Sequence, residues 1–366
     1  MQHTEIPMMS SDELRITYAQ QKKWIELFRA FDSDSDGFIP MTELKTRIEA
    51  AGETAGMSER QRHLLIQDAD KNRDQMIDFS EFCYLMAKAK QMHASSVMFR
   101  AAQMVTPKSE REEKFSYLQQ YSCWPPPIFM LLFTIIEIAV FIYYAASLGN
   151  VGVNSPVPTC SVLIYDPYLR IQAWRYLTYM LIHIGIYHIL FNSLTQLALG
   201  IPLELVHKWR IAVVYILGVI AGSMAVSVTD PKVFLAGASG GVYALIAAHL
   251  ANLVVNWDEM EFAIPRLIML VILIGADAGL AVWNYYRQHD KPQEKVSYVA
   301  HIGGFVAGLL MGIVVLRNFK KKTWERVVWW IALVGFILLL IFCVAWNIFS
   351  DQYYQYDDYY TNYKAC

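Results

Sequence analysis

The distribution of apolar residues divides the chain near residue 125 into two regions, one predicted to lie in water and the other in a membrane. Before this point, apolar residues such as Trp24 and Phe28 recur at helical spacing between charged ones, in a helix predicted over residues 14–31. After it come apolar runs of about 20 residues, the length that an α-helix needs to cross a bilayer. The pattern predicts an all-α chain in which an aqueous arm precedes a polytopic membrane helical bundle.

Seven apolar segments meet this length requirement. They lie at about residues 127–147, 176–199, 211–229, 239–256, 264–284, 298–316 and 326–349. Lys320, Lys321 and Lys322 precede the last segment, and positive charge marks the cytosolic side of a membrane. With a cytosolic N-terminus, seven spans place the C-terminus on the extracellular or lumenal side. Cys160 and Cys366 would then share the oxidising side, where a disulfide between them is an open option.

Composition agrees with a membrane protein. The chain is 55% hydrophobic and 17% charged, with a mean hydropathy of +0.28, whereas soluble domains are about 45–50% apolar and about 25% charged. A net charge of −2 argues against a nucleic-acid-binding surface. The first thirty residues lack an apolar signal sequence, so we expect the N-terminus to stay in the cytosol. The predicted organisation is an arm over residues 1–90, a linker over 91–125, the membrane domain over 126–349 and a tyrosine-rich tail over 350–366.

Two twelve-residue segments of the arm have the ligand spacing of EF-hand calcium loops. Residues 32–43 match D-x-D-x-D-G-x5-E throughout, and residues 70–81 depart from it at Gln75, where glycine is usual. Calcium is a hard cation that takes about 6–8 oxygen ligands, and this spacing supplies them. The loops therefore predict Ca²⁺ as a regulatory cofactor, and no cofactor is predicted for catalysis. The predicted ligands are Asp32, Asp34, Asp36, Glu43 and the Phe38 carbonyl in the first loop, and Asp70, Asn72, Asp74, Glu81 and the Met76 carbonyl in the second.

Two departures bear on affinity. Pro40, at the ninth position of the first loop, offers no side-chain ligand, and Gln75 needs a positive φ that costs roughly 1–2 kcal/mol in a non-glycine residue. Whether the second loop binds calcium or is degenerate therefore stays open. Ile39 and Ile77 hold matching positions and are expected to pair.

The linker contains a further amphipathic pattern. A helix formed by it could lie on the membrane, dock into the EF-hand groove or pack on the EF-hand pair.

Polar residues inside apolar spans are costly, and they mark a candidate catalytic site. The second segment contains His183, His188 and Asn192, Ser239 opens the fourth and His301 opens the sixth. These three spans run in the same direction, so Ser239 and His301 are expected at the same depth near the outer face. A hydroxyl within about 2.6–3.2 Å of an imidazole is the arrangement of an activated nucleophile.

The glycines of the same segments support this pairing. Gly304 and Gly308 form a ridge that lets helix backbones approach closely, which would bring His301 onto Ser239 beside Gly240. The free N–H groups at the helix start, with the His188 and Asn192 side chains, could donate to an oxyanion. No acidic third member is evident, which predicts a Ser–His dyad. Glu137 and Asp277 lie deep in spans without an assigned role.

These motifs resemble those of the rhomboid family of intramembrane serine proteases, over roughly residues 125–350. The motifs are His183-x4-His188-x3-Asn192, Gly237-Ala-Ser239-Gly240 and Ala300-His301-Ile-Gly303-Gly304. The resemblance implies that Ser239 is the nucleophile, that His301 is the general base, and that His188 and Asn192 are oxyanion donors. It further implies that Tyr243 packs on the catalytic imidazole and that Trp174-Arg175 and Glu204 are structural.

Six core spans with a seventh at the C-terminal side, preceded by EF-hands, are similar to the animal rhomboid-related subfamily. The resemblance implies a protein of the plasma membrane or secretory pathway that cleaves single-pass membrane proteins near the outer end of the spanning helix. Growth-factor precursors are substrates of that family. Calcium binding to the arm is hypothesised to shift the activity, with a sign that the sequence leaves open.

Three other interpretations remain. The chain could be an inactive rhomboid-like protein that binds client helices, although such proteins typically lack the serine or the histidine. It could be a calcium-gated channel, although few charges lie within its spans. The EF-hands could also be a calcium-independent spacer beside an active protease. Oligomeric state and substrate identity do not follow from the sequence.

Overall fold

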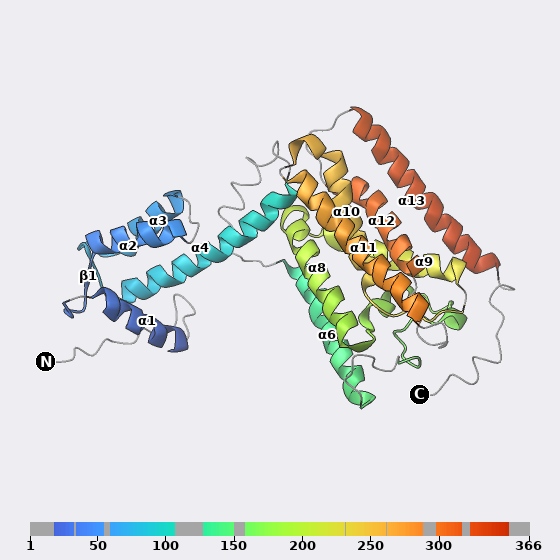
Figure 1. Ribbon diagram of the computed structural model, residues 1–366, viewed down its shortest axis with the longest axis horizontal. Helices are drawn as coiled ribbons and strands as arrows, with labels where there is room; N and C mark the ends of the chain where they lie inside the picture. Colours follow the sequence, from blue (N-terminus) through green and yellow to red (C-terminus); the bar gives the residue numbers. More distant parts are fainter. Residues whose placement is uncertain are drawn as a thin grey trace. The chain divides into compact units, whose positions relative to one another are not determined.

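The computed structural model describes residues 18–32, 34–54, 59–106, 127–149, 158–230, 232–260, 262–287, 298–316 and 323–350. The chain forms two compact units, one of residues 1–100 with 115–124 and one of residues 101–114 with 125–366. α-Helices dominate the described residues of both units, which confirms the all-α prediction (Figure 1).

The first unit contains two helix–loop–helix segments joined by a short antiparallel ladder. Its elements are α1 (Tyr18–Phe31), β1 (Ile39–Pro40), α2 (Met41–Thr54), α3 (Glu59–Ala69), β2 (Met76–Ile77) and α4 (Phe79–Val105). In the ladder Ile39 lies opposite Ile77, which confirms the predicted pairing. α4 continues past residue 90 into the predicted linker, and its last turn, after residue 100, belongs to the second unit.

The apolar face predicted for the first helix is the core face of this unit. Trp24 and Phe28 are buried, and the Phe28 ring meets Phe79 and Phe82 edge-on at 5.4 Å. Within the described residues the helix begins at Tyr18, so residues 14–17 of the prediction lie outside them. Burial raises the pKa of the core thiol Cys83 to about 11, which makes it an unreactive structural residue.

The second unit is a bundle of seven main helices, one for each predicted apolar segment. They are α6 (Ile128–Ser147), α8 (Gly185–His207), α9 (Arg210–Thr229), α10 (Ser239–Val255), α11 (Ala263–Arg287), α12 (Tyr298–Val315) and α13 (Thr323–Phe349). Five of them are long and apolar enough to cross a membrane, which supports a polytopic bundle. α10 is shorter, at 17 residues, and α11 is not among the five, so the count of seven spans is not confirmed.

The second predicted segment begins later than its apolar pattern suggests. Its first residues form two short helices, α7 (Arg175–Thr178) and η3 (Tyr179–Leu181), and α8 starts only at Gly185, whose φ is +77°. The buried Arg175 guanidinium donates to the carbonyls of Ser161 and Ile164, which ties this stretch to the preceding loop. His183 therefore lies before the helix and not, as predicted, within it.

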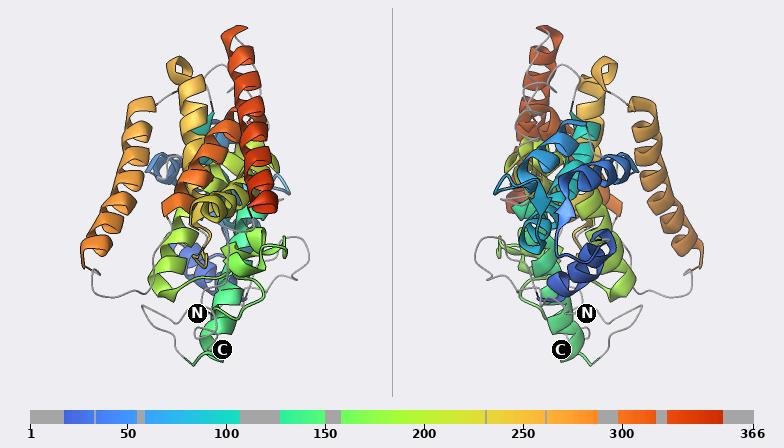
Figure 2. Two further views of the ribbon diagram at one scale, coloured as in Figure 1. Left: turned by 90° about the vertical axis from the view of Figure 1, so that its right-hand side faces the viewer. Right: turned by 90° about the vertical axis from the view of Figure 1, so that its left-hand side faces the viewer.

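Small residues bring α9, α10 and α12 into close contact. A Cβ added to Gly304 would lie 2.1 Å from the Gly240 carbonyl oxygen, and one added to Gly308 would lie 2.4 Å from Ala244 Cα. The predicted close approach of the two helices is thus confirmed, since nothing larger than hydrogen fits there. Within this unit α13 packs on α12 and α9, while α11 packs on α10 at the opposite flank (Figure 2).

Buried carboxyl groups help to fix α6 in the bundle. Glu204 of α8 accepts from the backbone N–H groups of Phe129 at 2.8 Å and Met130 at 3.0 Å, at the N-terminus of α6 where N–H groups lack intrahelical partners. Glu137 of α6 accepts from the hydroxyl of Tyr215 on α9 at 3.1 Å. Both carboxyls therefore have structural partners in the bundle.

Candidate active site

Ser239 and His301 face each other across the closest helix contact of the bundle. Ser239 is the first residue of α10, and His301 lies in the first turn of α12. His301 Nε2 is 2.9 Å from Ser239 Oγ, a hydrogen-bonding distance. The glycine contact between Gly304 and Gly240 sits directly beside this pair. The predicted pair is thus brought together, with the nitrogen positioned to take the hydroxyl proton.

Aromatic rings hold the imidazole of His301. Tyr243, one helical turn after Ser239, stacks on it with ring centroids 4.4 Å apart and an interplanar angle of 15°. Tyr298 meets the same imidazole edge-on at 6.0 Å. The packing of Tyr243 on His301 that the resemblance implied is therefore present. It leaves the imidazole little freedom to rotate away from Ser239.

A carboxylate that the sequence left unassigned completes the surroundings of His301. Asp277 Oδ2 of α11 lies 3.0 Å from His301 Nδ1 and accepts a hydrogen bond of 2.6 Å from the Tyr243 hydroxyl. The sequence shows no acidic residue near the predicted Ser–His dyad, and the fold brings Asp277 beside it from another helix. The signal in the sequence was a charged residue within an otherwise apolar segment, which is costly without a partner.

The turn before Ser239 is bordered by the two other predicted polar residues. Gly237 has φ +118°, and a Cβ added there would lie 2.7 Å from His188 Nε2 and 3.8 Å from Asn192 Nδ2. His188 Nδ1 accepts a long contact of 3.4 Å from the Ile184 N–H, which favours the tautomer with its proton on Nε2. Asn192 Nδ2 is buried and, among the described residues, has no hydrogen-bond partner.

His183 supports this arrangement from the segment before α8. Its Nε2 accepts a contact of 3.4 Å from the Ala238 N–H, and its ring meets that of His188 at 5.2 Å and 65°. The backbone of Gly237 is in turn held by its N–H donating to the Tyr179 carbonyl at 3.1 Å. The loop that presents Ser239 is thus fixed on both sides.

The first predicted calcium loop folds around its carboxylates. Asp32, Asp34 and Asp36 place oxygens within 4.8 Å of one another. Asp32 also accepts from the N–H groups of Asp36 at 3.1 Å and Gly37 at 3.0 Å, and Gly37 has φ +91°. Three converging carboxylates suit a hard divalent cation. Glu43 instead pairs with Arg47 at 2.9 Å.

The second loop repeats this hydrogen-bond pattern. Asp70 accepts from the N–H groups of Asp74 at 3.2 Å and Gln75 at 2.9 Å, as Asp32 does in the first loop. Gln75 adopts φ +63°, the left-handed conformation that glycine would take there. Glu81 turns into the loop, where its Oε1 accepts from the Lys71 N–H at 2.9 Å. Its acidic side chains do not converge within 4.8 Å as those of the first loop do, so calcium binding by the second loop stays a prediction.

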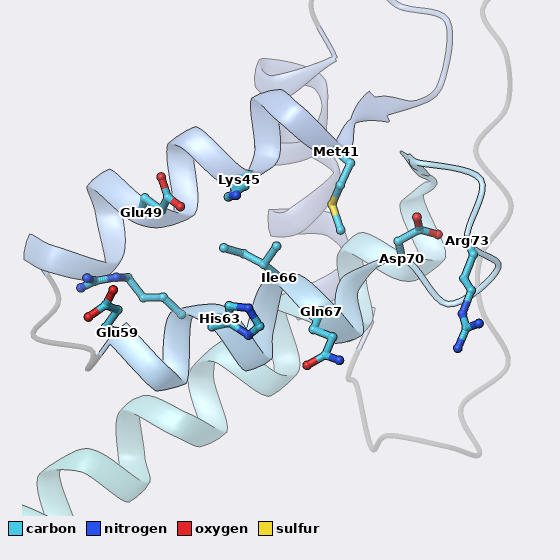
Figure 3. A pocket seen from close by; sticks show the side chains of 10 residues that line it. Met41, Lys45, Glu49, Glu59, His63, Ile66, Gln67, Asp70 and Arg73 are labelled. Atoms are coloured by element: carbon cyan, nitrogen blue, oxygen red, sulfur yellow. The ribbon is translucent and has the colours of Figure 1, made fainter.

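A groove of about 840 Å³ lies in the first unit between α2, α3 and the second loop (Figure 3). Met41 and Ile66 are the apolar side chains that line it. The others are all charged or polar, including Lys45, Glu59 and Arg73. In this conformation the groove lacks the continuous apolar surface that an amphipathic helix needs for docking.

Comparisons with known proteins match the two regions of the chain in which these sites lie. The Rhomboid domain family matches residues 170–318, and the EF-hand domain pair family matches residues 21–87. "Inactive rhomboid-related protein 2" of Caenorhabditis elegans is 39% identical over 328 residues, which cover 89% of this chain and 93% of that protein. "Rhomboid-related protein 3" of Homo sapiens is 35% identical over 367 residues, which cover 92% of this chain and 90% of that protein. "Rhomboid-related protein 2" of Mus musculus is 42% identical over 247 residues, which cover 64% and 79%.

Proposed function

The chain belongs to the rhomboid family, and from this premise we propose that it is an intramembrane serine endopeptidase. Its substrates would be single-pass membrane proteins, with growth-factor precursors as candidates, cut near the outer end of the spanning helix. The observation that carries the proposal is the 2.9 Å contact between His301 Nε2 and Ser239 Oγ. A hydroxyl and an imidazole at this distance form an activated nucleophile.

The chemistry follows from the position of each group. A substrate helix that unwinds locally presents its carbonyl carbon to Ser239 Oγ, which attacks as its proton passes to His301 Nε2. The scissile C–N bond then breaks, and His301 returns the proton to the departing amine. Water, activated by the same imidazole, hydrolyses the acyl ester and regenerates Ser239. The His188 and Asn192 side chains and the Ser239 N–H would stabilise the oxyanion.

An inactive, client-binding role is the second candidate. One relative carries the word "inactive" in its name, and it covers most of this chain. Here, however, the serine and the histidine are both present and in contact, and the Asn192 amide near them is buried. A chain that binds helices without cutting them has no need of this constellation, which favours catalysis.

The disulfide bond of Cys160 supports the orientation proposed for the chain in the membrane. Cys160, in the loop after α6, is disulfide-bonded, and its partner lies outside the described residues, so the pairing with Cys366 stays a prediction. Structural disulfides form on the oxidising side of a membrane. We therefore place this loop and the C-terminus outside or in the lumen, and the N-terminus in the cytosol, at the plasma membrane or along the secretory pathway.

Calcium is the proposed regulator. The ligands would be Asp32, Asp34, Asp36, Glu43 and the Phe38 carbonyl in one loop, and Asp70, Asn72, Asp74, Glu81 and the Met76 carbonyl in the other. α4 begins at the second loop, and its last turn contributes Val105 to the core of the membrane unit. A change at the loop therefore has a continuous helix along which to act, and we propose that calcium alters the cleavage rate.

The test uses the full-length protein in liposomes with a single-pass substrate that carries helix-weakening residues near its outer end. We expect Ser239→Ala and His301→Ala each to abolish cleavage, while Ser147→Ala, a serine outside the site, leaves it unchanged. A fluorophosphonate probe, which reacts with activated serines, should label the intact protein at Ser239. Cleavage by Ser239→Ala at the rate of the intact protein would overturn the proposal, and a folded intact protein that neither cuts nor labels would favour the client-binding role.

A further inference from the structure

Asp277 is a charged residue of the apolar helix α11, and within the described residues its hydrogen bond and its ion pair both go to side chains of the candidate active site. Its Oδ2 receives the Tyr243 hydroxyl at 2.6 Å and lies 3.0 Å from His301 Nδ1. The three residues come from α10, α11 and α12, so they share no local sequence relation. A carboxylate in the bilayer is costly unless it is paired, which makes its partners the first clue to its role.

We propose that Asp277 is a positioning residue for the imidazole of the Ser239–His301 pair. This inference rests on the proposed protease function and deepens it. The carboxylate fixes which imidazole nitrogen carries the proton and which faces the serine. It acts through His301 and does not itself touch the substrate.

The geometry assigns one task to each nitrogen of the imidazole. With its proton on Nδ1, the nitrogen that lies 3.0 Å from Asp277, His301 has a free electron pair on Nε2, which faces Ser239 Oγ at 2.9 Å. When the serine proton moves to Nε2 the ring becomes a cation, and the adjacent carboxylate stabilises it. No proton needs to pass to Asp277, which stays ionised throughout, as in other serine–histidine–aspartate sites.

Tyr243 adds a second constraint on the carboxylate. Its hydroxyl binds Oδ2, the same oxygen that approaches His301, while its ring stacks on the imidazole at 4.4 Å. The Tyr243 side chain thus contacts both the Asp277 carboxylate and the His301 imidazole. The approach of Nδ1 to Oδ2 does not meet the angle of a full hydrogen bond, which is common at catalytic sites before substrate binds and tightens them.

Among the described residues, no other contact of Asp277 accounts for its charge. Arg266 of the same helix lies three turns away and binds His249 Nδ1 at 2.6 Å and the Met104 carbonyl at 3.1 Å. α11 packs on α10 and otherwise presents exposed apolar residues such as Val271 and Ile272. A carboxylate kept on this helix for stability alone would have no partner except the active-site imidazole and its tyrosine.

The first test reads the imidazole proton directly and does not depend on cleavage. The full-length protein is labelled with ¹⁵N-histidine in nanodiscs, and the His301 signals are assigned by their loss in His301→Gln. We expect the Nδ1–H tautomer in the intact protein and in Asp258→Asn, which alters an exposed aspartate outside the site. We expect Asp277→Asn to redistribute the proton between the two nitrogens, and Asp277→Glu to retain it on Nδ1.

The second test measures cleavage in liposomes with the same variants. Asp277→Asn should lower kcat by about 10²–10⁴-fold with little change in KM, because the wrong tautomer impairs the chemical step rather than binding. Asp277→Glu should recover part of that loss. Tyr243→Phe, which keeps the ring but loses the hydroxyl, should give a smaller loss and serves as a second variant if the Asn protein unfolds.

The outcomes separate this inference from the proposed function. An unchanged tautomer in Asp277→Asn, or cleavage equal to that of the intact protein, overturns the positioning role of Asp277 while the protease proposal stands. A tautomer that depends on Asp277 in a protein that cuts nothing supports the positioning role and overturns the proposed function. Equal losses in Asp277→Asn and Asp258→Asn would show a general effect of charge and would also overturn the inference.

Discussion

At the scale of single residues, Asn192 is the side chain whose hydrogen bonding points most directly to catalysis. Its Nδ2 is buried and, among the described residues, has no partner. An unsatisfied buried donor costs roughly 1–3 kcal/mol, and a ligand that accepts its hydrogen bond removes this cost. The oxyanion of the tetrahedral intermediate is the ligand that this position would meet, beside the Gly237 turn.

We therefore expect Asn192→Ala to lower kcat by roughly 10²–10³-fold, the usual effect of losing one oxyanion donor, with KM almost unchanged. The thermal midpoint should hold steady or rise, because the unsatisfied amide is removed. Steady-state kinetics in liposomes and a thermal unfolding curve check both halves. A variant that loses stability but keeps its kcat would show that the amide is structural.

At the scale of elements, the α10–α12 contact determines whether the site exists. Gly304 has no space for a Cβ, since the Gly240 carbonyl would lie 2.1 Å from it. Gly304→Ala must separate the two helices, and overpacking of this kind costs about 1–3 kcal/mol. We expect the variant to lose stability and most of its activity together, because His301 moves with α12 and loses contact with Ser239.

Gly335→Ala is the matched control, since nothing lies within 4 Å of a Cβ added there, on α13. It should leave both quantities within error of the intact protein. Fluorophosphonate labelling of Ser239 and thermal unfolding provide the two readouts. Normal labelling of Gly304→Ala would mean that the helices adjust without disturbing the pair, contrary to the expectation.

α11 is the helix whose role the sequence indicates least, although its Asp277 lies beside His301 in the candidate site. It packs on α10 at one flank of the bundle and exposes much of its apolar surface. Arg266 near its start binds the Met104 carbonyl at the end of α4, and Asp277, three turns later, faces His301. One helix thus contacts both the last turn of α4 and the active site.

At the scale of the whole molecule, α4 is the element through which calcium binding in the loops would affect the active site. The Val105 carbonyl accepts from Asn252 Nδ2 at 2.9 Å, inside the membrane unit. We expect Glu43→Gln combined with Glu81→Gln to abolish any difference in cleavage rate between calcium and chelator. Asn252→Ala should weaken that difference while leaving the rate in chelator close to that of the intact protein.

Cleavage assays over a calcium titration measure both effects, and calcium binding to each variant is measured separately as a control. A calcium response that survives the double loop variant would make the EF-hands a spacer beside an independent protease. A full response in Asn252→Ala would move the coupling away from the last turn of α4.

The sequence by itself determined those features whose physics is local. Apolar runs long enough for a bilayer need no tertiary information, and neither do ligands spaced within a twelve-residue loop. The Ser239–His301 pair was also predictable, because parallel spans and a glycine ridge constrain depth and approach. The resemblance to known motifs made the same pair specific.

Only the tertiary structure decided which side chains meet when no local rule relates them. Asp277 faces His301 because the rotation of α11 about its axis is set by packing on α10, which no apolar run encodes. His183 lies outside α8 because the helix starts only at Gly185, after a stretch that Arg175 ties to the preceding loop. Hydrophobic periodicity fixes what can enter the bilayer, whereas the register and rotation of helices inside it depend on long-range packing.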